Sequence, residues 1–235
     1  MFFHLEPKKA TLSDVNAALI AFYRDLRDHP EELFSGISNL ANHFDAMDEG
    51  LKTDFYLQLR EEFNSLTPTM RKSELFYALN KLCFNGLYRE NSKGKFNVPF
   101  GKKKSFPILS LPDFLEAADR LKDVKLETSD FEYTARQARA GDFIYFDPPY
   151  IPIDSTSNFT SYSSGGFDLS SQERLASLMK TLRDNGVKAM LSNSSTPLTV
   201  ETYSGLRQVA ISAPRMVSAK SSGRGRIDEL IIMNY

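Results

Sequence analysis

The chain has 235 residues, of which 41% are hydrophobic and 25% charged, a composition that is ordinary for one large globular domain or one domain with an insertion. The single cysteine, Cys83, excludes an intramolecular disulfide framework and fits a reducing, cytoplasmic setting. The sequence has no run of about 18 apolar residues, so neither a transmembrane helix nor a membrane partner is expected. The net charge of −1, taken alone, argues against a nucleic-acid partner.

The first elements are expected to be the end of a helix at residues 2–5 and a short strand at residues 10–12. From Val15 onwards the apolar residues recur at helical spacing and predict a second helix. Asp14 lies between that strand and that helix. An acid at this place can bind the ribose hydroxyls of a nucleotide, or it can be the N-cap of the helix. The residue pattern alone favours the cap.

Residues 31–82 carry helical periodicity without the alternation typical of strands. The apolar residues of the middle helix recur every fourth position and are expected to be core: Phe55, Leu59 and Phe63. Ser73 is expected to cap a further helix over residues 73–82. We interpret the whole stretch as a helical insertion between two parts of an α/β sheet.

Residues 84–101 combine turn signals with positive charge. Asn85-Gly86 predicts a turn, and Gly94, between two short extended pieces, predicts a hairpin. Over residues 89–104, six basic residues accompany a single acid, Glu90: Arg89, Lys93, Lys95, Lys102, Lys103 and Lys104. Such a cluster suits nucleic-acid phosphates, although charge alone favours a solvated loop. An arginine can also read a guanine edge, whereas lysines more often hold phosphates.

Residues 109–121 are expected to form another helix, and residues 124–127 a strand. Asp130 and Phe131 follow that strand and open a predicted helix that runs to about residue 139. From the residues alone, this pair is a capping acid and a core aromatic ring.

The apolar run at residues 143–146 predicts a short, fully buried strand of a parallel sheet. Asp147-Pro148-Pro149-Tyr150 follows, and two prolines without N–H groups must end the strand. Ligands bind at the carboxyl ends of strands in open α/β sheets. The Asp147 carboxylate and the Pro148 carbonyl could accept both hydrogens of an amine on a flat ring, with Tyr150 stacked on that ring. The alternative is a strand that ends in a solvated turn.

Two later stretches are predicted loops. Residues 151–167 are rich in serine, threonine and glycine and predict a mobile loop, in which Phe159 and Tyr162 would line a pocket for a base. Residues 215–226 are basic and glycine-containing, and either contact DNA phosphate or form a solvated hairpin turn.

The remaining elements complete an α/β pattern. Ser170 and Glu173 are expected to form a capping box at the start of a helix. Residues 187–191 and 230–233 are predicted core strands. No metal is expected, because the three histidines and the cysteine are not grouped as ligands.

Several of these stretches resemble one family in their order along the chain. Asp147-Pro148-Pro149-Tyr150 resembles motif IV of the amino-methyltransferases that depend on S-adenosylmethionine. Further stretches resemble the Dam-type DNA adenine methyltransferases: residues 84–91, 94–101, 158–162, 191–194 and 228–235. The resemblance implies an α/β fold, a Rossmann-like methyltransferase sheet with a helical target-recognition insertion and a hairpin. It divides the chain into a catalytic domain, residues 1–30 and 106–235, and a target-recognition domain, residues 31–105.

The implied function is transfer of a methyl group from S-adenosylmethionine to a flipped adenine in duplex DNA, at GATC. The resemblance assigns the catalytic chemistry to Asp147, Pro148, Pro149 and Tyr150. It assigns cofactor binding to Asp14, Asp130, Phe131 and Asp147. It assigns DNA binding to Phe84, Leu87, Arg89, Asn91, Lys93, Pro99, Lys102 and Lys103. The enzyme is expected to be a monomer when complete.

One part of the family pattern is not found. The family holds the methionine end of its cofactor with a loop of the type Phe-x-Gly-x-Gly, and no such sequence occurs here. The chain is therefore expected to begin just inside the second element of the fold. Two alternatives follow: an inactive, truncated DNA-binding remnant, or an amino-methyltransferase that acts on cytosine or on a protein glutamine.

Overall fold

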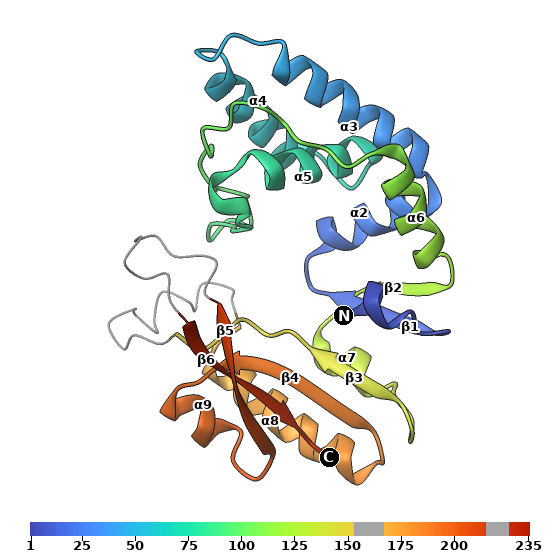
Figure 1. The fold of residues 1–235 in the computed structure, drawn as a ribbon, viewed down its shortest axis with the longest axis vertical. Helices are drawn as coiled ribbons and strands as arrows, with labels where there is room; N and C mark the ends of the chain where they lie inside the picture. The colour runs from blue at the N-terminus through green and yellow to red at the C-terminus, as the bar shows by residue number, and fades with distance from the viewer. Residues whose placement is uncertain (153–166, 215–225) are drawn as a thin grey trace. The chain divides into compact units, whose positions relative to one another are not determined.

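A computed structural model describes residues 1–152, 167–214 and 226–235. The chain divides into two compact units, Met1–Asp130 and Phe131–Tyr235, which are described separately (Figure 1). Within the described residues, no helix is long and apolar enough to cross a membrane.

The first unit contains a pair of parallel strands, β1 (Ala10–Asp14) and β2 (Val124–Thr128), as predicted. The short helix α1 (Phe2–Leu5) precedes them. Helix α2 (Ala17–Asp28) follows β1 directly and is tied to β2 by two arginine side chains. Arg24 donates to the carbonyl of Leu126 at 2.7 Å, and Arg27 to that of Val124 at 3.0 Å.

Helices make up most of this unit, which confirms the predicted helical stretch. They are α3 (Pro30–Asp45), α4 (Lys52–Ser65), α5 (Met70–Leu82) and α6 (Leu111–Leu121). Helix α5 packs against α2, α3 and α4, and its apolar side chains lie in the centre of the core with Leu33, Ile37 and Phe44. Burial of these aliphatic and aromatic surfaces is the main stabilising contribution.

The expected cap at Ser73 is wrong. Helix α5 begins earlier, and its cap is Thr69, whose hydroxyl accepts a hydrogen bond from the Lys72 amide. Ser73 is buried within the helix and donates to the Asp25 carboxylate at 2.6 Å. The hydroxyl of a serine inside a helix can form a hydrogen bond to a neighbouring helix. Sequence spacing does not distinguish such a serine from an N-cap.

The second unit has a four-stranded mixed sheet of order β3-β4-β6-β5. Strand β3 (Phe143–Phe146) pairs in parallel with β4 (Lys188–Ser194), whereas β6 (Arg226–Met233) pairs antiparallel with both β4 and β5 (Arg207–Pro214). Among the described residues of this unit, three helices accompany the strands: α7 (Phe131–Ala135), α8 (Leu169–Asp184) and α9 (Pro197–Thr202). The apolar face of α8 packs with Leu191 and Ile232 in the core of this unit.

Two predicted elements of the second unit need correction. Strand β3 is not fully buried: Phe143 is 43% exposed and Tyr145 36%, and only Phe146 is buried. In the described sheet β3 lies at an edge and pairs with β4 alone. Helix α7 ends at Ala135 instead of continuing to residue 139, because the amides of Gln137 and Ala138 bond three residues back and tighten the turn that follows.

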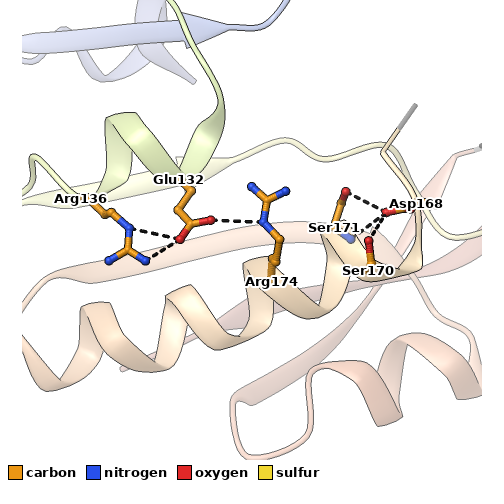
Figure 2. Close-up of polar contacts among 6 residues, drawn as sticks. All are labelled: Glu132, Arg136, Asp168, Ser170, Ser171 and Arg174. Atoms are coloured by element: carbon orange, nitrogen blue, oxygen red, sulfur yellow. Dashed lines mark hydrogen bonds and ion pairs between the residues drawn. The ribbon is translucent and has the colours of Figure 1, made fainter. Parts of the chain in front are cut away.

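The predicted capping box at Ser170 and Glu173 is also wrong. Asp168 is the N-cap of α8, and its Oδ1 accepts a hydrogen bond from the Ser171 amide at 2.9 Å (Figure 2). The hydroxyls of Ser170 and Ser171 donate to the same oxygen. These bonds hold the pKa of the Asp168 carboxyl below its usual value. Asp168, two residues before Ser170, is therefore the N-cap that sequence spacing had assigned to Ser170.

Candidate functional site

The segment Asp147-Pro148-Pro149-Tyr150 lies where it was predicted, directly after β3 at the carboxyl end of a parallel strand pair. Asp147 and Pro149 are exposed, and Pro148 is buried. Within the described residues, neither the Asp147 carboxylate nor the Pro148 carbonyl has a hydrogen-bond partner. Two adjacent acceptors are thus available at the strand end.

A buried amide network holds the backbone immediately after these acceptors. The side-chain amide of Gln172, on α8, donates to the Pro149 carbonyl at 2.8 Å. Asn193, on β4, accepts from the Ile151 amide at 2.9 Å and donates to Gln172 at 3.3 Å. The Tyr203 hydroxyl donates to the Gln172 oxygen. Gln172 and Asn193 are 3% and 0% exposed, so both backbone groups are held by side chains shielded from water.

Tyr150 is also tied by its hydroxyl. That hydroxyl donates to Ser192 Oγ at 2.8 Å and lies 3.3 Å from a carboxylate oxygen of Glu229. Burial, followed by the Glu229 charge, raises the pKa of Tyr150, so the phenol stays protonated as a donor at neutral pH. The residue as a whole is 37% exposed, so part of its surface is accessible.

Phe131 belongs to an aromatic cluster in the second unit. Its ring centroid lies 6.3 Å from that of Phe146 and 5.4 Å from that of Phe167, and the Arg174 guanidinium lies 5.0 Å over the ring. Arg174 also pairs with Glu132, which is held by Arg136, the residue directly after α7 (Figure 2). The arginines lower the pKa of the Glu132 carboxyl, Arg136 most strongly. Phe131 is therefore a fixed aromatic surface at the start of α7.

Asp14 and Asp130 lie at the carboxyl ends of the paired strands β1 and β2 in the first unit. The residue before Asp130, Ser129, donates its amide to the Asp14 carbonyl at 3.1 Å, which keeps the two strand ends together. Asp14 does not cap α2. The cap is Asn16, whose side chain accepts from the Ala18 and Leu19 amides, while Asp14 Oδ1 accepts from the Asn16 amide at 2.7 Å.

The predicted DNA-binding residues gather in one irregular segment of the first unit, residues 84–104, which we call the recognition segment. Asn85 and Gly86 both have positive φ, 54° and 64°, and make the predicted turn. Phe84 donates its amide to the Pro99 carbonyl at 2.9 Å, which joins the two ends of the hairpin. Phe84 and Leu87 are 47% and 45% exposed.

The hairpin is present, but its strands are reduced to isolated bridges, Cys83 with Phe100 and Glu90 with Phe96. Asn91 builds its tip, because its side-chain oxygen accepts from the Lys93 and Lys95 amides at 2.9 and 3.1 Å. This bonding explains why an asparagine stands there, and it leaves the side-chain NH2 group for other contacts.

Arg89 and Tyr88 lie next to each other on the same strand of this hairpin. Arg89 Nε donates to the Asn97 side-chain oxygen at 2.8 Å. The Tyr88 hydroxyl donates to Glu90 at 2.6 Å. Burial, with the Glu90 carboxylate, raises the pKa of Tyr88.

The lysines at the end of the segment follow a fixed backbone. Gly101 donates its amide to the Leu82 carbonyl at 2.8 Å, and a Cβ at this position would lie 2.5 Å from the Cys83 carbonyl oxygen. Lys102 adopts a positive φ of 52°. Lys102 and Lys103 are exposed. The basic side chains therefore project from a turn whose backbone conformation is fixed.

Sequence reasoning missed Gln172 entirely. Its spacing carries a signal, because Gln172 lies three and seven positions before Leu175 and Met179, on the buried face of α8. A polar residue on an apolar helical face must have a hydrogen-bond partner inside the protein. Phe159, Tyr162 and the basic loop at 215–225 lie outside the described residues. Within the described part of the chain, no group of three metal-ligating side chains occurs.

Comparison with known proteins gives consistent matches. A family model described as D12 class N6 adenine-specific DNA methyltransferase matches residues 1–217. The chain is 42% identical to the Type II methyltransferase M1.LlaDCHI of Lactococcus lactis subsp. cremoris, over 100% of this chain and 82% of the relative. It is 37% identical to the Type II methyltransferase M.MjaIII of Methanocaldococcus jannaschii, over 98% and 81%. It is 35% identical to a DNA adenine methylase of Vibrio cholerae, over 99% and 82%.

Proposed function

Because this chain belongs to the D12 class of N6 adenine-specific DNA methyltransferases, we propose that it transfers the methyl group of S-adenosylmethionine to a flipped adenine in duplex GATC. The observation that carries the proposal is a pair of acceptors, Asp147 and Pro148, that have no partner among the described residues. They lie on a backbone fixed by Gln172 and Asn193.

The candidate residues of each unit, taken separately, suit parts of an adenosine-containing cofactor. Asp14 is half-buried at a strand end, with one carboxylate oxygen bonded to the Asn16 amide, and its other oxygen can accept from ribose hydroxyls. Asp130, at the end of the neighbouring strand, adds a second acceptor. Phe131 presents a supported aromatic ring that can pack against adenine. S-adenosylmethionine, when bound, supplies an electrophilic methyl group.

The chain's own residues would prepare the amine for attack. The exocyclic amine of adenine is a poor nucleophile because its lone pair is delocalised into the ring. The Asp147 carboxylate would accept one amine hydrogen and the Pro148 carbonyl the other, which favours a tetrahedral nitrogen with a localised lone pair. Tyr150, fixed through Ser192, would stack on the flipped base, while Pro149 holds the turn. The methylated amine then releases its extra proton to solvent, so this step requires no strong base.

The recognition segment would bind the duplex. The Arg89 bond to Asn97 uses Nε, so the terminal amino groups are the pair that can donate to guanine O6 and N7. Lys93, Lys102 and Lys103 would hold phosphates. Three exposed apolar residues would contact bases in the groove: Phe84, Leu87 and Pro99. The polar Asn91 would add a further contact. On this proposal residues 31–105 are the target-recognition domain and residues 1–30 and 106–235 the catalytic domain.

The test is methyl transfer by the Asp147→Ala variant. Labelled S-adenosylmethionine and a GATC duplex are used, with Asp184→Ala as a matched surface control, since Asp184 is an exposed acid at the far end of α8. Asp147→Ala should reduce the rate by at least about 100-fold without loss of duplex affinity. Activity within about threefold of the parent would contradict the assignment. A parent protein that binds duplex but transfers no label would contradict the proposed activity itself.

A further inference from the structure

Helix α4 carries four polar side chains at intervals of four residues, Lys52, Tyr56, Arg60 and Asn64. Residues four apart lie on the same helical face. All four bond to the backbone of residues 96–104. Lys52 donates to the Lys104 carbonyl at 2.6 Å, and Tyr56 and Arg60 donate to the Val98 carbonyl at 2.8 and 3.3 Å. Asn64 donates to the Phe96 carbonyl at 3.0 Å and accepts from its amide at 2.8 Å.

This part of the recognition segment needs such partners. Phe96 and Val98 are each 2% exposed, yet the hairpin offers them only isolated bridges instead of a strand ladder. Buried backbone groups without partners are costly, so the side chains of α4 take the place of a neighbouring strand. The donors themselves are protected: Lys52 is 6% exposed with its ammonium 4.8 Å over the Phe44 ring, and Tyr56 is fully buried.

The backbone of residues 96–98, which α4 holds, is hydrogen-bonded to Arg89. Asn97 lies between the two residues that α4 fixes, and its amide donates to the Arg89 carbonyl at 3.1 Å. Its side-chain oxygen accepts from Arg89 Nε at 2.8 Å. Asn97 therefore fixes both the backbone and the guanidinium of Arg89, and α4 fixes Asn97 from both sides.

We propose that Lys52, Tyr56, Arg60 and Asn64 are positioning residues for sequence recognition, through which α4 sets the orientation of Arg89 before DNA binds. The proposal rests on the base-reading role proposed above for Arg89. A preformed segment avoids the ordering cost that a flexible hairpin incurs on binding, and it rejects a wrong base because it does not adjust to it.

A purely structural role for α4 predicts a different outcome. If these bonds only stabilise the fold, weakening one lowers the melting temperature and leaves the rates on correct and altered duplexes in the same ratio. If they orient Arg89, the ratio itself falls in a protein that is still folded. The ratio of kcat/KM on GATC to kcat/KM on a duplex with one base changed is therefore the measurement.

The sharpest variant is Asn64→Asp, with Gln58→Glu as the control. Both substitutions exchange an amide for an acid on α4, and Gln58 is exposed. When ionised, the introduced carboxylate accepts from the Phe96 amide but cannot donate to the Phe96 carbonyl, whereas the protonated acid can donate. The ratio for Asn64→Asp should be at least about fivefold lower than that of the parent near pH 8, where the introduced carboxylate is ionised. Gln58→Glu should follow the parent throughout.

Tyr56→Phe is the second variant, because it removes one hydroxyl from a buried ring and nearly preserves its packing. It should also lower the ratio while circular dichroism shows a folded protein. Ratios that stay within about twofold of the parent in both variants would overturn the positioning role. Arg89→Ala, measured in parallel, separates the two proposals. If it lowers the ratio and the α4 variants do not, only the α4 inference fails; if it does not lower the ratio, the proposed role of Arg89 has failed.

Discussion

Two irregular segments, one in each unit, are held by side chains instead of by regular secondary structure. In the recognition segment, residues 84–104, the holding side chains come from one helix at equal spacing, and Arg60 and Asn64 are only half-buried. In the segment at 147–152, they come from α8, β4 and the residue after α9, and they bond to one another as well as to the backbone.

This difference predicts two kinds of sensitivity. The side chains of α4 do not bond to one another, so the loss of one bond leaves the others in place and the effects should be graded; Tyr56 and Arg60, which share the Val98 carbonyl, are the pair expected to depart from additivity. Gln172, Asn193 and Tyr203 form one buried network, in which removing a member leaves a shielded polar group without its partner. The catalytic segment should therefore tolerate less change than the recognition segment.

Gln172→Glu should give the larger effect and tests the buried network. A carboxylate at this position cannot donate to the Pro149 carbonyl, whereas the protonated acid can, so kcat should fall by about 10-fold or more at pH 8 and recover in part as the pH falls. The burial of the site raises the pKa of such a carboxyl, which extends the recovery into the neutral range. The KM for DNA should change little.

Gln137→Glu, an exposed position in the same unit, is the matched control for this measurement. Equal pH profiles for the two variants would show that Gln172 does not position the Asp147 segment.

Arg89→Ala should have the next largest effect, confined to sequence choice. The loss of two hydrogen bonds to guanine should reduce discrimination between GATC and a duplex changed at that guanine by about 1–3 kcal/mol, with a much smaller loss of non-specific affinity. Competition between the two duplexes in one reaction measures this directly. An unchanged preference would mean that another residue reads the base.

Replacement of Lys102 and Lys103 by glutamine should have the smallest effect on discrimination. Both side chains are exposed, and phosphate contacts carry no sequence information. Affinity should fall equally for all duplexes, and the slope of log affinity against log salt should decrease by about one for each phosphate that is no longer neutralised. A change in base preference in this variant would show that the phosphate-binding role of the lysines and the base-reading role of Arg89 cannot be separated.

Patterns in the sequence predicted the parts of the site that depend on local chemistry. The turn at Asn85-Gly86 and the strand end at Asp147 follow from glycine and proline geometry, which acts within a few residues. The helices of the first unit follow from apolar periodicity. The order of the motifs along the chain indicated the family, and the match to the family model confirms the family.

Long-range hydrogen bonds could not be predicted in the same way. The four-residue spacing of Tyr56, Arg60 and Asn64 is visible in the sequence, but nothing local shows that their partners lie at residues 96–98. The edge position of β3 and the cap at Asp168 likewise depend on which groups the fold brings close together. Secondary-structure propensity does not predict those contacts. Polar residues on a buried helical face are the available signal, and they indicate that a partner exists without identifying it.

The bonds between α4 and the recognition segment also affect the order in which the chain takes shape. They join residues separated by 32 to 52 positions, so each one closes a long loop. At a synthesis rate of about 5–20 residues per second, Lys104 leaves the ribosome about 3–10 seconds after Lys52. During that interval α4 can already be helical, with its four polar side chains bonded to water. The surface proposed to read DNA therefore forms after the helix that supports it, as one of the later steps in the folding of the first unit.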